Sequence, residues 1–197
     1  MRNTGVTARG IITPIFKQGD SLADSVVNSV LDASINDNFA LNDGDIIGVT
    51  EAVVARTQGN YADCAQIARD IRNKFGGKEL GIVFPILSRN RFSVLLKAIA
   101  MGTEKLYIQL SYPADEVGNL LVNRDVFETT GVNPYSDSFT LDEFRKIFGK
   151  ESTVHRFTGV DYIEYYKSLN PNIEVIFSND PTYILKYTKN VLNCDIH

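Results

Sequence analysis

A strand–helix–strand pattern occupies residues 80–110, which read LGIVFPILSRNRFSVLLKAIAMGTEKLYIQL. The apolar run at 80–87 predicts one strand, and the run at 105–110 predicts another. The intervening residues 91–101 are apolar at helical spacing, which predicts a helix. Strands and helices in alternation favour an α/β or mixed sheet with helical cover.

The same alternation extends to both sides of this segment. Further strands are predicted at 10–16, 46–55 (as one buried strand or two short ones), 173–177 and 191–196. Helices are predicted at 20–35, 61–75, 114–121, 140–148, 160–169 and 181–187. We therefore expect an α+β or mixed α/β fold in which helices cover a sheet.

Residues 123–158 interrupt the alternation. They are rich in Asn, Ser, Asp and Thr, and they are predicted to hold two short helices. A segment of this composition between regular elements is typical of an insertion or lid. We expect a single domain over 1–197, with 1–122 and 159–197 as one lobe and 123–158 as an inserted lid.

Composition and charge restrict the possible functions. The chain is 44% hydrophobic with a net charge of −4, and no basic run exceeds two residues. A nucleic-acid partner is not expected, because duplex binding needs a basic patch. Two cysteines without a CxxC motif fit a reducing compartment. Since no segment approaches 18 consecutive apolar residues, we expect a cytoplasmic protein without a membrane partner.

The common catalytic and nucleotide-binding signatures are absent. The sequence has no G-x-x-x-x-G-K-[ST], no H-E-x-x-H and no G-x-S-x-G motif, and no G-x-G-x-x-G follows a predicted strand. Its two histidines, His155 and His197, are too few for a site built from several histidines. A bound metal would need oxygen ligands, which suits Mg²⁺ or Mn²⁺.

Polar residues follow three of the predicted strands. They are Ser88, Arg89, Asn90 and Arg91 after the first, Ser178, Asn179 and Asp180 after the second, and Asp195 and His197 in the last. Ligands of open α/β sheets bind beyond the carboxyl ends of the strands. The first group places two guanidinium groups at the start of a helix, which predicts a phosphate or anion site. The second group supplies oxygen ligands, with Asn179 and Asp180 as candidates for a divalent cation.

Ordinary structural roles can also account for these residues. Ser88, Asn90 and Asp180 precede predicted helices, where such side chains serve as N-caps. The two arginines can be solvated surface charges. Residue spacing alone therefore supports a ligand that bears phosphate and specifies nothing further.

Two segments in the first 60 residues carry a family resemblance. Residues 14–22 read PIFKQGDSL, and residues 41–59 read LNDGDIIGVTEAVVARTQG. In order and spacing they resemble the gamma-glutamyl ligases of coenzyme F420. In that family a Pro-containing loop leads to a Gly-Asp-x-Leu helix start, and a Leu-x-Asp-Gly-Asp turn feeds a strand. The remainder of the chain is more similar to a divergent bacterial branch of the family, and the whole resembles its N-terminal domain.

The resemblance implies a GTP-dependent ligase that joins glutamate to a carboxylate-bearing acceptor by way of an acyl phosphate. It implies nucleotide contacts at Ile12, Thr13, Pro14, Ile15, Glu51 and Ala52, and a phosphate-binding cation at Arg56. It also implies Mg²⁺ or Mn²⁺ as the metal. A homodimer is expected, because the family tends to build its site where two subunits meet.

Several positions depart from the family pattern. Arg56 stands where the family has lysine, which keeps the charge but changes the donor geometry, and Ala52 replaces a residue that is commonly lysine. The Asp-bearing metal segment of the family has no clear counterpart, and residues 88–90 occupy about that place. The later Ser-Asp metal motif is matched in order by residues 178–180. Two alternatives follow: a non-catalytic domain of the same fold that binds a nucleotide or phosphorylated metabolite, and an assembly domain in which the polar strand ends are helix caps.

The C-terminal strand adds an expectation about length. Residues 191–196 are predicted to form an apolar strand at the end of the chain, and a bare edge of that kind invites aggregation. We therefore expect 1–197 to be the N-terminal part of a longer protein. Edges at 10–16 and 191–197 would also make pairing in a homodimer reasonable.

Overall fold

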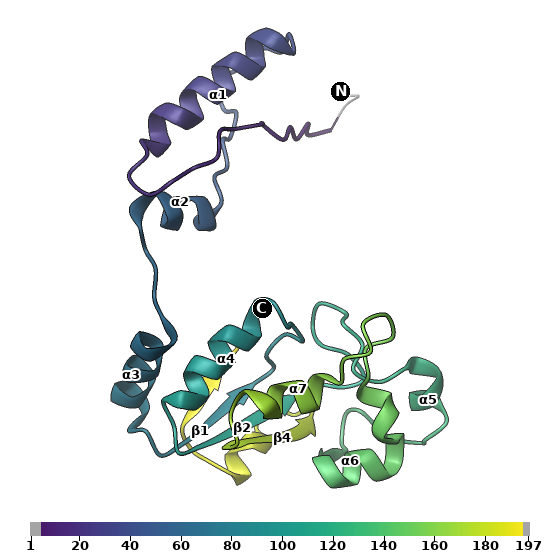
Figure 1. Ribbon diagram of the computed structural model, residues 1–197. Coiled ribbons are helices and arrows are strands. Elements are labelled where there is room, and N and C mark those ends of the chain that lie inside the picture. The colour runs from purple at the N-terminus through teal and green to yellow at the C-terminus, as the bar shows by residue number, and fades with distance from the viewer. Residues whose placement is uncertain (1–4, 195–197) are drawn as a thin grey trace. The chain divides into compact units, whose positions relative to one another are not determined.

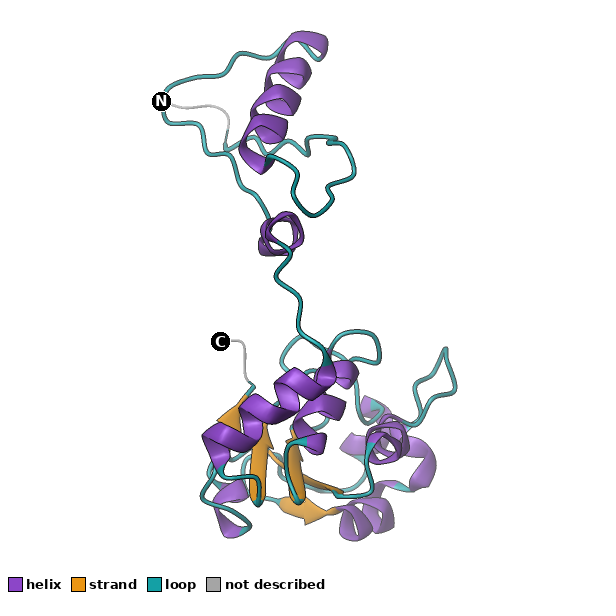
Figure 2. Ribbon diagram, turned by 60° about the vertical axis from the view of Figure 1, so that its left-hand side comes forward, coloured by secondary structure: helices purple, strands orange, loops and turns teal. Residues whose placement is uncertain are grey.

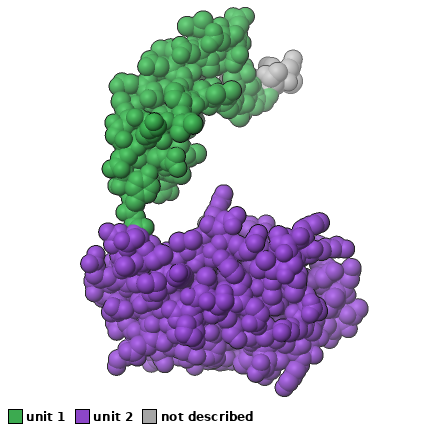
Figure 3. Space-filling view, viewed as in Figure 1, with its two compact units in different colours: residues 1–62 green, residues 63–197 purple. Residues whose placement is uncertain are grey.

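The computed structural model describes residues 5–194 and consists of two compact units. Unit 1 is Met1–Ala62 and unit 2 is Asp63–His197 (Figure 3). Unit 2 holds all five strands of the described chain, so the architecture is mixed α/β, as predicted. Within the described residues, no helix combines the length and the apolar character needed to span a membrane.

Unit 2 is built on one five-stranded sheet in the order β3-β4-β2-β1-β5. Four strands run parallel, namely β1 (Glu79–Val83), β2 (Lys105–Leu110), β4 (Ile173–Ser178) and β5 (Val191–Asn193). The short strand β3 (Ser138–Thr140) runs antiparallel to β4 at one edge. The parallel strands bring their carboxyl ends to one edge of the sheet, where the connecting loops gather.

One face of this sheet carries the main hydrophobic core. Leu80, Ile82 and Ile108 are buried there, and in-register pairing sets Ile82 beside Ile108. The face is covered by α4 (Phe92–Met101) and α7 (Tyr162–Leu169), with α3 (Cys64–Phe75) packed against α4. Figures 1 and 2 both show α4 and α7 lying over the strands. The near-continuous apolar character of the strands reflects this cover.

The opposite face is covered by the short 3-10 helix η2 (Tyr183–Lys186), which belongs to the connection from β4 to β5. Ile184 is fully buried against Val83 and Ile176 on this face. Gly81 lies beneath it, and a Cβ atom there would be 2.6 Å from Ile184 Cγ1. The absence of a side chain at Gly81 therefore lets η2 approach the sheet closely.

Residues 123–158, which were expected as an inserted lid, lie within unit 2. They form α5 (Arg124–Glu128), β3, α6 (Leu141–Phe148) and the 3-10 helix η1 (Lys150–Thr153). Helix α6 begins with the predicted capping box, in which Thr140 and Glu143 satisfy each other's backbone N–H groups. Its residues Phe144 and Phe148 are buried in the main core.

Unit 1 contains two helices, α1 (Leu22–Asn36) and α2 (Glu51–Gln58), joined by irregular segments. Helix α1 was predicted from its apolar stripe. Of its apolar residues only Val30 is buried, while Val27, Leu31 and Ile35 are about half exposed or more. Described unit 1 therefore has little hydrophobic core of its own.

Two predicted strands in unit 1 are wrong. Residues 10–16 and 46–50 are irregular, and α2 begins at Glu51 inside the segment predicted as the strand 46–55. A strand needs a neighbour for its backbone N–H and C=O groups, and residues 5–62 contain no strand to supply one. The left-handed Gly59 (φ 69°) caps α2 and explains where the helix ends.

Other boundaries in unit 2 also differ from the predictions. Strand β1 ends at Val83 rather than at 87, because Phe84 adopts a positive φ of 52° and Pro85 has no N–H to donate. The predicted helix 114–121 is a loop, in which the Asp115 side chain binds the backbone instead. The predicted helix 181–187 is reduced to η2. Of the strand predicted at 191–196, β5 covers 191–193, and residues 195 and 196 are not described. Asp195 and His197 lie outside the described residues.

The contact between α3 and α4 gives a stability prediction. We expect Gly102→Ala to lower the free energy of unfolding by about 1–3 kcal/mol, because of overpacking. Its φ of −85° suits alanine, but a Cβ there would lie 2.6 Å from the Ala68 carbonyl oxygen and 3.0 Å from Ile71. Urea unfolding measures the loss. Gly48→Ala is the control, since nothing lies within 4 Å of its Cβ position, and equal effects for both variants would contradict the prediction.

Candidate functional site

The predicted nucleotide contacts Glu51, Ala52 and Arg56 lie together on helix α2 of unit 1. All three are exposed, with Glu51 in the first turn and Arg56 in the last. Ala52 and Arg56 are four residues apart, so they share one face of the helix. An anion near this face would meet a guanidinium group, while Glu51 lies at the helix end that favours acidic side chains.

The predicted nucleotide loop, Ile12 to Ile15, is an irregular and largely exposed segment. The chain that follows it is joined to the end of α2. The Gly19 N–H donates to the Thr57 carbonyl oxygen at 2.9 Å, and the Gln18 side chain lies over Gly59. The structure therefore brings the end of the 14–22 segment to the end of the helix that carries Arg56.

A second candidate group lies in unit 2, in the loop between β1 and α4. Arg89, Asn90 and Arg91 are exposed, and their side chains make no hydrogen bond or ion pair to any residue in 5–194. Ser88 instead has a structural role: its Oγ accepts from the Arg91 N–H at 3.1 Å, and its carbonyl oxygen accepts from the Ser93 N–H. This arrangement leaves two guanidinium groups at the start of α4, where they can bind an anion.

The third predicted group, at the end of β4, is engaged in protein contacts. The Asn179 amide accepts from the Tyr112 N–H at 3.0 Å and donates to the Tyr112 carbonyl oxygen at 2.7 Å. Asp180 Oδ1 accepts from the Thr182 N–H and hydroxyl at 2.8 and 2.7 Å. These hydrogen bonds hold the pKa of Asp180 below its usual value.

The donors of this group fit a preformed metal site poorly. Both polar ends of Asn179 are occupied, and Asp180 is exposed with only its Oδ2 atom free of hydrogen bonds to described residues. Among the described residues, no group of three or more His, Cys, Asp or Glu side chains could hold a metal ion. Asp180 can contribute one carboxylate oxygen, which is a partial ligand set at most.

Two buried residues that the sequence did not single out hold the loop before α4. Asp115, which is 8% exposed, accepts from the Leu87 N–H at 2.9 Å and from the Asn119 N–H at 2.7 Å. Tyr166 on α7 is fully buried, and burial raises the pKa of its hydroxyl. The only sequence signal was the turn-forming pattern Asp115-x-x-Gly118-Asn119, which argues against a helix there.

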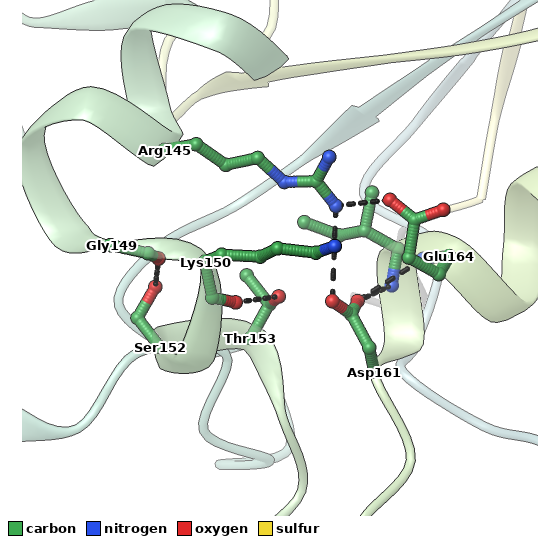
Figure 4. A network of polar contacts seen from close by, with 8 residues as sticks. Arg145, Gly149, Lys150, Ser152, Thr153, Asp161 and Glu164 are labelled. Atoms are coloured by element: carbon green, nitrogen blue, oxygen red, sulfur yellow. Dashed lines mark hydrogen bonds and ion pairs between the residues drawn. The ribbon is translucent and has the colours of Figure 1, made fainter.

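The start of α7 is fixed by a charged network, shown in Figure 4. Asp161 caps the helix by accepting from the Ile163 and Glu164 N–H groups at 2.9 and 3.1 Å. Arg145 on α6 lies 3.8 Å from Asp161 Oδ2 and makes a shorter ion pair with Glu164. That hydrogen bond lowers the pKa of Glu164. The network therefore ties α6 to the helix that carries Tyr166.

Comparison with known proteins gives one match. A family model described as F420-0:gamma-glutamyl ligase matches residues 10–149, well over half of the chain. The matched region includes the candidate residues on α2 and those at the start of α4. No curated protein and no solved structure matches the chain significantly.

Proposed function

Because the chain belongs to the F420-0:gamma-glutamyl ligase family, we propose that it is a GTP-dependent ligase that forms an amide between glutamate and a carboxylate-bearing acceptor. The observation that carries this proposal is the family match over 10–149, which contains the exposed Arg56 on α2 and the exposed Arg89 and Arg91 before α4. A ligase role follows from the family. GTP as the nucleotide, the divalent metal and the acyl-phosphate route are implied by the family resemblance and are part of the proposal.

The proposed reaction proceeds in two displacements. A carboxylate oxygen of the acceptor attacks the γ-phosphorus of GTP, and GDP leaves with the electrons of the broken P–O bond. The amine of glutamate then attacks the acyl carbon, phosphate leaves, and the amine loses a proton. The protein mainly has to position the reactants and stabilise negative charge on the phosphoryl oxygens.

We assign the candidate residues to the nucleotide or to its phosphate groups according to their charge. We assign Ile12, Thr13, Pro14, Ile15, Glu51 and Ala52 to the nucleotide, as the family resemblance implies. Arg56, Arg89 and Arg91 are assigned to the phosphate groups, since a planar guanidinium can donate two parallel hydrogen bonds to one phosphate. All three arginine side chains are exposed, and none makes a hydrogen bond or ion pair to a described residue.

A divalent cation, Mg²⁺ or Mn²⁺, is also proposed. Because both polar ends of Asn179 already bond to Tyr112 and Asp180 offers one free oxygen, we place most of the cation's ligands on the nucleotide phosphates. This is the usual arrangement for Mg²⁺, which binds through one or two carboxylates together with substrate phosphates. A cytoplasmic location is proposed as well, and two free cysteines agree with it.

A homodimer is part of the proposal. Unit 1 exposes apolar side chains on α1 and in its irregular segments, among them Ile12, Ile15 and Ile46, which are 82–95% exposed. Apolar surface of this extent is typical of a surface that is covered in the functional protein. We propose that a second copy of the chain covers it, and the mass measured by light scattering tests this.

Calorimetric titration tests nucleotide binding. We expect GTP to bind in the presence of Mg²⁺ or Mn²⁺, and Arg56→Ala to weaken this binding because one charge-assisted contact to phosphate is lost. GDP and ATP are titrated in parallel to define specificity. Absence of binding by all three nucleotides would overturn the proposal. Phosphate release from GTP that requires both glutamate and F420-0, the acceptor named by the family, tests ligation itself.

One observation favours a second candidate function. The partial ligand set at Asn179 and Asp180, together with alanine at position 52, suits a domain that binds a nucleotide or phosphorylated metabolite without catalysis. The two candidates differ in one result. Both predict that Arg56→Ala weakens binding, but phosphate release that depends on glutamate is expected only for the ligase.

A further inference from the structure

The loop that carries Arg89 and Arg91 is irregular, yet its backbone is held at nearly every residue. We define this 86–91 loop as the segment between Pro85 and the start of α4 at Phe92. It contains no helix or strand, so its N–H and C=O groups need partners from elsewhere. Two side chains that are distant in sequence supply them.

Tyr166 binds the loop on both sides of Leu87. Its hydroxyl donates to the Ile86 carbonyl oxygen at 2.9 Å and accepts from the Ser88 N–H, also at 2.9 Å. One hydroxyl group therefore donates one hydrogen bond to the loop backbone and accepts another from it. The side chain is fully buried, and it reaches the loop from α7, 78 residues away in sequence from Ser88.

Asp115 binds Leu87, the residue between those two contacts. Its carboxylate accepts from the Leu87 N–H at 2.9 Å. Two further hydrogen bonds from Asn119, one from its backbone and one from its side chain, both 2.7 Å long, fix the carboxylate itself. The carboxylate is 8% exposed, so solvent competes little for these bonds.

Helix α4 completes the set of contacts. Ser93 donates from its hydroxyl to the Arg89 carbonyl oxygen, and the Tyr165 hydroxyl lies 3.3 Å from the Ser93 Oγ. Each residue from 86 through 89, and Arg91, thereby has at least one backbone group in a hydrogen bond, while the Arg89 and Arg91 side chains remain exposed. A rigid backbone with free cationic side chains is an arrangement suited to binding.

We propose that Tyr166 and Asp115 are positioning residues, which hold the 86–91 loop in one conformation so that Arg89 and Arg91 can bind the phosphate groups of the nucleotide. This inference rests on the proposed function. The physical reason is entropic: ordering a free loop on binding costs conformational entropy, and a loop ordered beforehand avoids that cost. Neither residue needs to touch the nucleotide.

The variant that tests this is Tyr166→Phe, which removes only the hydroxyl. The matched control is Tyr162→Phe on the same helix, because the Tyr162 hydroxyl makes no hydrogen bond to a described residue and its ring contacts His155 and Tyr166. We expect Tyr166→Phe to weaken GTP binding about tenfold, and Tyr162→Phe to leave it unchanged. Asp115→Asn, which keeps the size of the side chain, is the second variant should Tyr166→Phe fail to fold.

Two readouts separate a positioning role from general destabilisation. Amide hydrogen exchange at 86–88 is expected to accelerate at least tenfold in Tyr166→Phe, under conditions where α4 and the strands keep their protection. In a double-mutant cycle, Arg89→Ala is expected to weaken GTP binding less in the Tyr166→Phe background than in the wild type. Additive effects of the two substitutions would overturn the proposal.

Mg²⁺-pyrophosphate serves as a second probe, because it carries phosphate without the nucleoside. If GTP binds and Tyr166→Phe behaves like Tyr162→Phe, the positioning role is overturned and the proposed function stands. If pyrophosphate binds in a manner sensitive to Tyr166→Phe but GTP does not bind, the positioning role stands and the nucleotide assignment fails. If neither probe binds the wild type, both are overturned.

Discussion

The Phe144→Ala variant is expected to lose about 3–5 kcal/mol of its free energy of unfolding. Phe144 is fully buried, and its ring stacks on Phe177 of β4 with the centroids 3.8 Å apart. It also contacts Phe148 at 4.6 Å and Tyr112 at 6.1 Å between ring centroids. Truncation removes a large apolar side chain and leaves a cavity that the surrounding rings fill only in part.

The size of this effect depends on where α6 packs. The helix belongs to the 123–158 segment, and Phe144 joins that segment to strand β4 in the main core. Since single domains have total stabilities of about 5–15 kcal/mol, the loss is a large part of the whole. Urea unfolding followed by circular dichroism measures it. Phe157→Ala, at a position that is 91% exposed, is the control, and a loss below about 1 kcal/mol for Phe144→Ala would contradict the prediction.

The Arg89→Ala/Arg91→Ala double variant is expected to weaken GTP binding about 100-fold, which corresponds to about 2.7 kcal/mol. Each guanidinium is exposed and has no partner among the described residues, so it is available for a charge-assisted bond to phosphate. The start of α4 adds oriented N–H groups at the same place. The double variant therefore removes both of the unit 2 side chains that we propose bind the nucleotide phosphates.

Two comparisons make this result specific. Arg69→Ala on α3 removes an exposed arginine elsewhere in unit 2 and is expected to leave GTP binding unchanged. Raised salt is expected to weaken GTP binding to the wild type more than to the double variant, because exposed charges are screened. Calorimetric titration measures both. A change of less than threefold in the double variant would show that the phosphates bind elsewhere.

Local patterns predicted much of unit 2 correctly. Strand β2 has the predicted limits 105–110, and α4, α6 and α7 begin within two residues of their predicted starts. These elements have clear periodicity and clear end signals, such as the capping box at Thr140 and Glu143. The failures in unit 1 are in segments whose state depends on distant partners. Residues 46–50 have the β-branched composition of a strand but no neighbour within the described unit 1.

For the candidate residues too, local features could be predicted from the sequence and contacts with distant residues could not. That Arg89 and Arg91 follow a strand and begin a helix could be predicted, because both elements are local patterns. The role of Asn179 could not, since its hydrogen-bond partner is set by the folded chain. Asp180 caps a turn nearby, as one interpretation of the sequence had it, whereas Asn179 binds Tyr112, 67 residues away.

Composition, periodicity and end signals established an α/β chain whose polar residues follow its strands, because those features depend on neighbours a few positions apart. The five-stranded order, the place of 123–158 in the core and the contacts of Tyr166 and Asp115 with the 86–91 loop depend on tertiary structure. A tyrosine at helical spacing indicates only a packed face. Whether its hydroxyl holds a loop 78 residues away is decided when α7 packs beside α4.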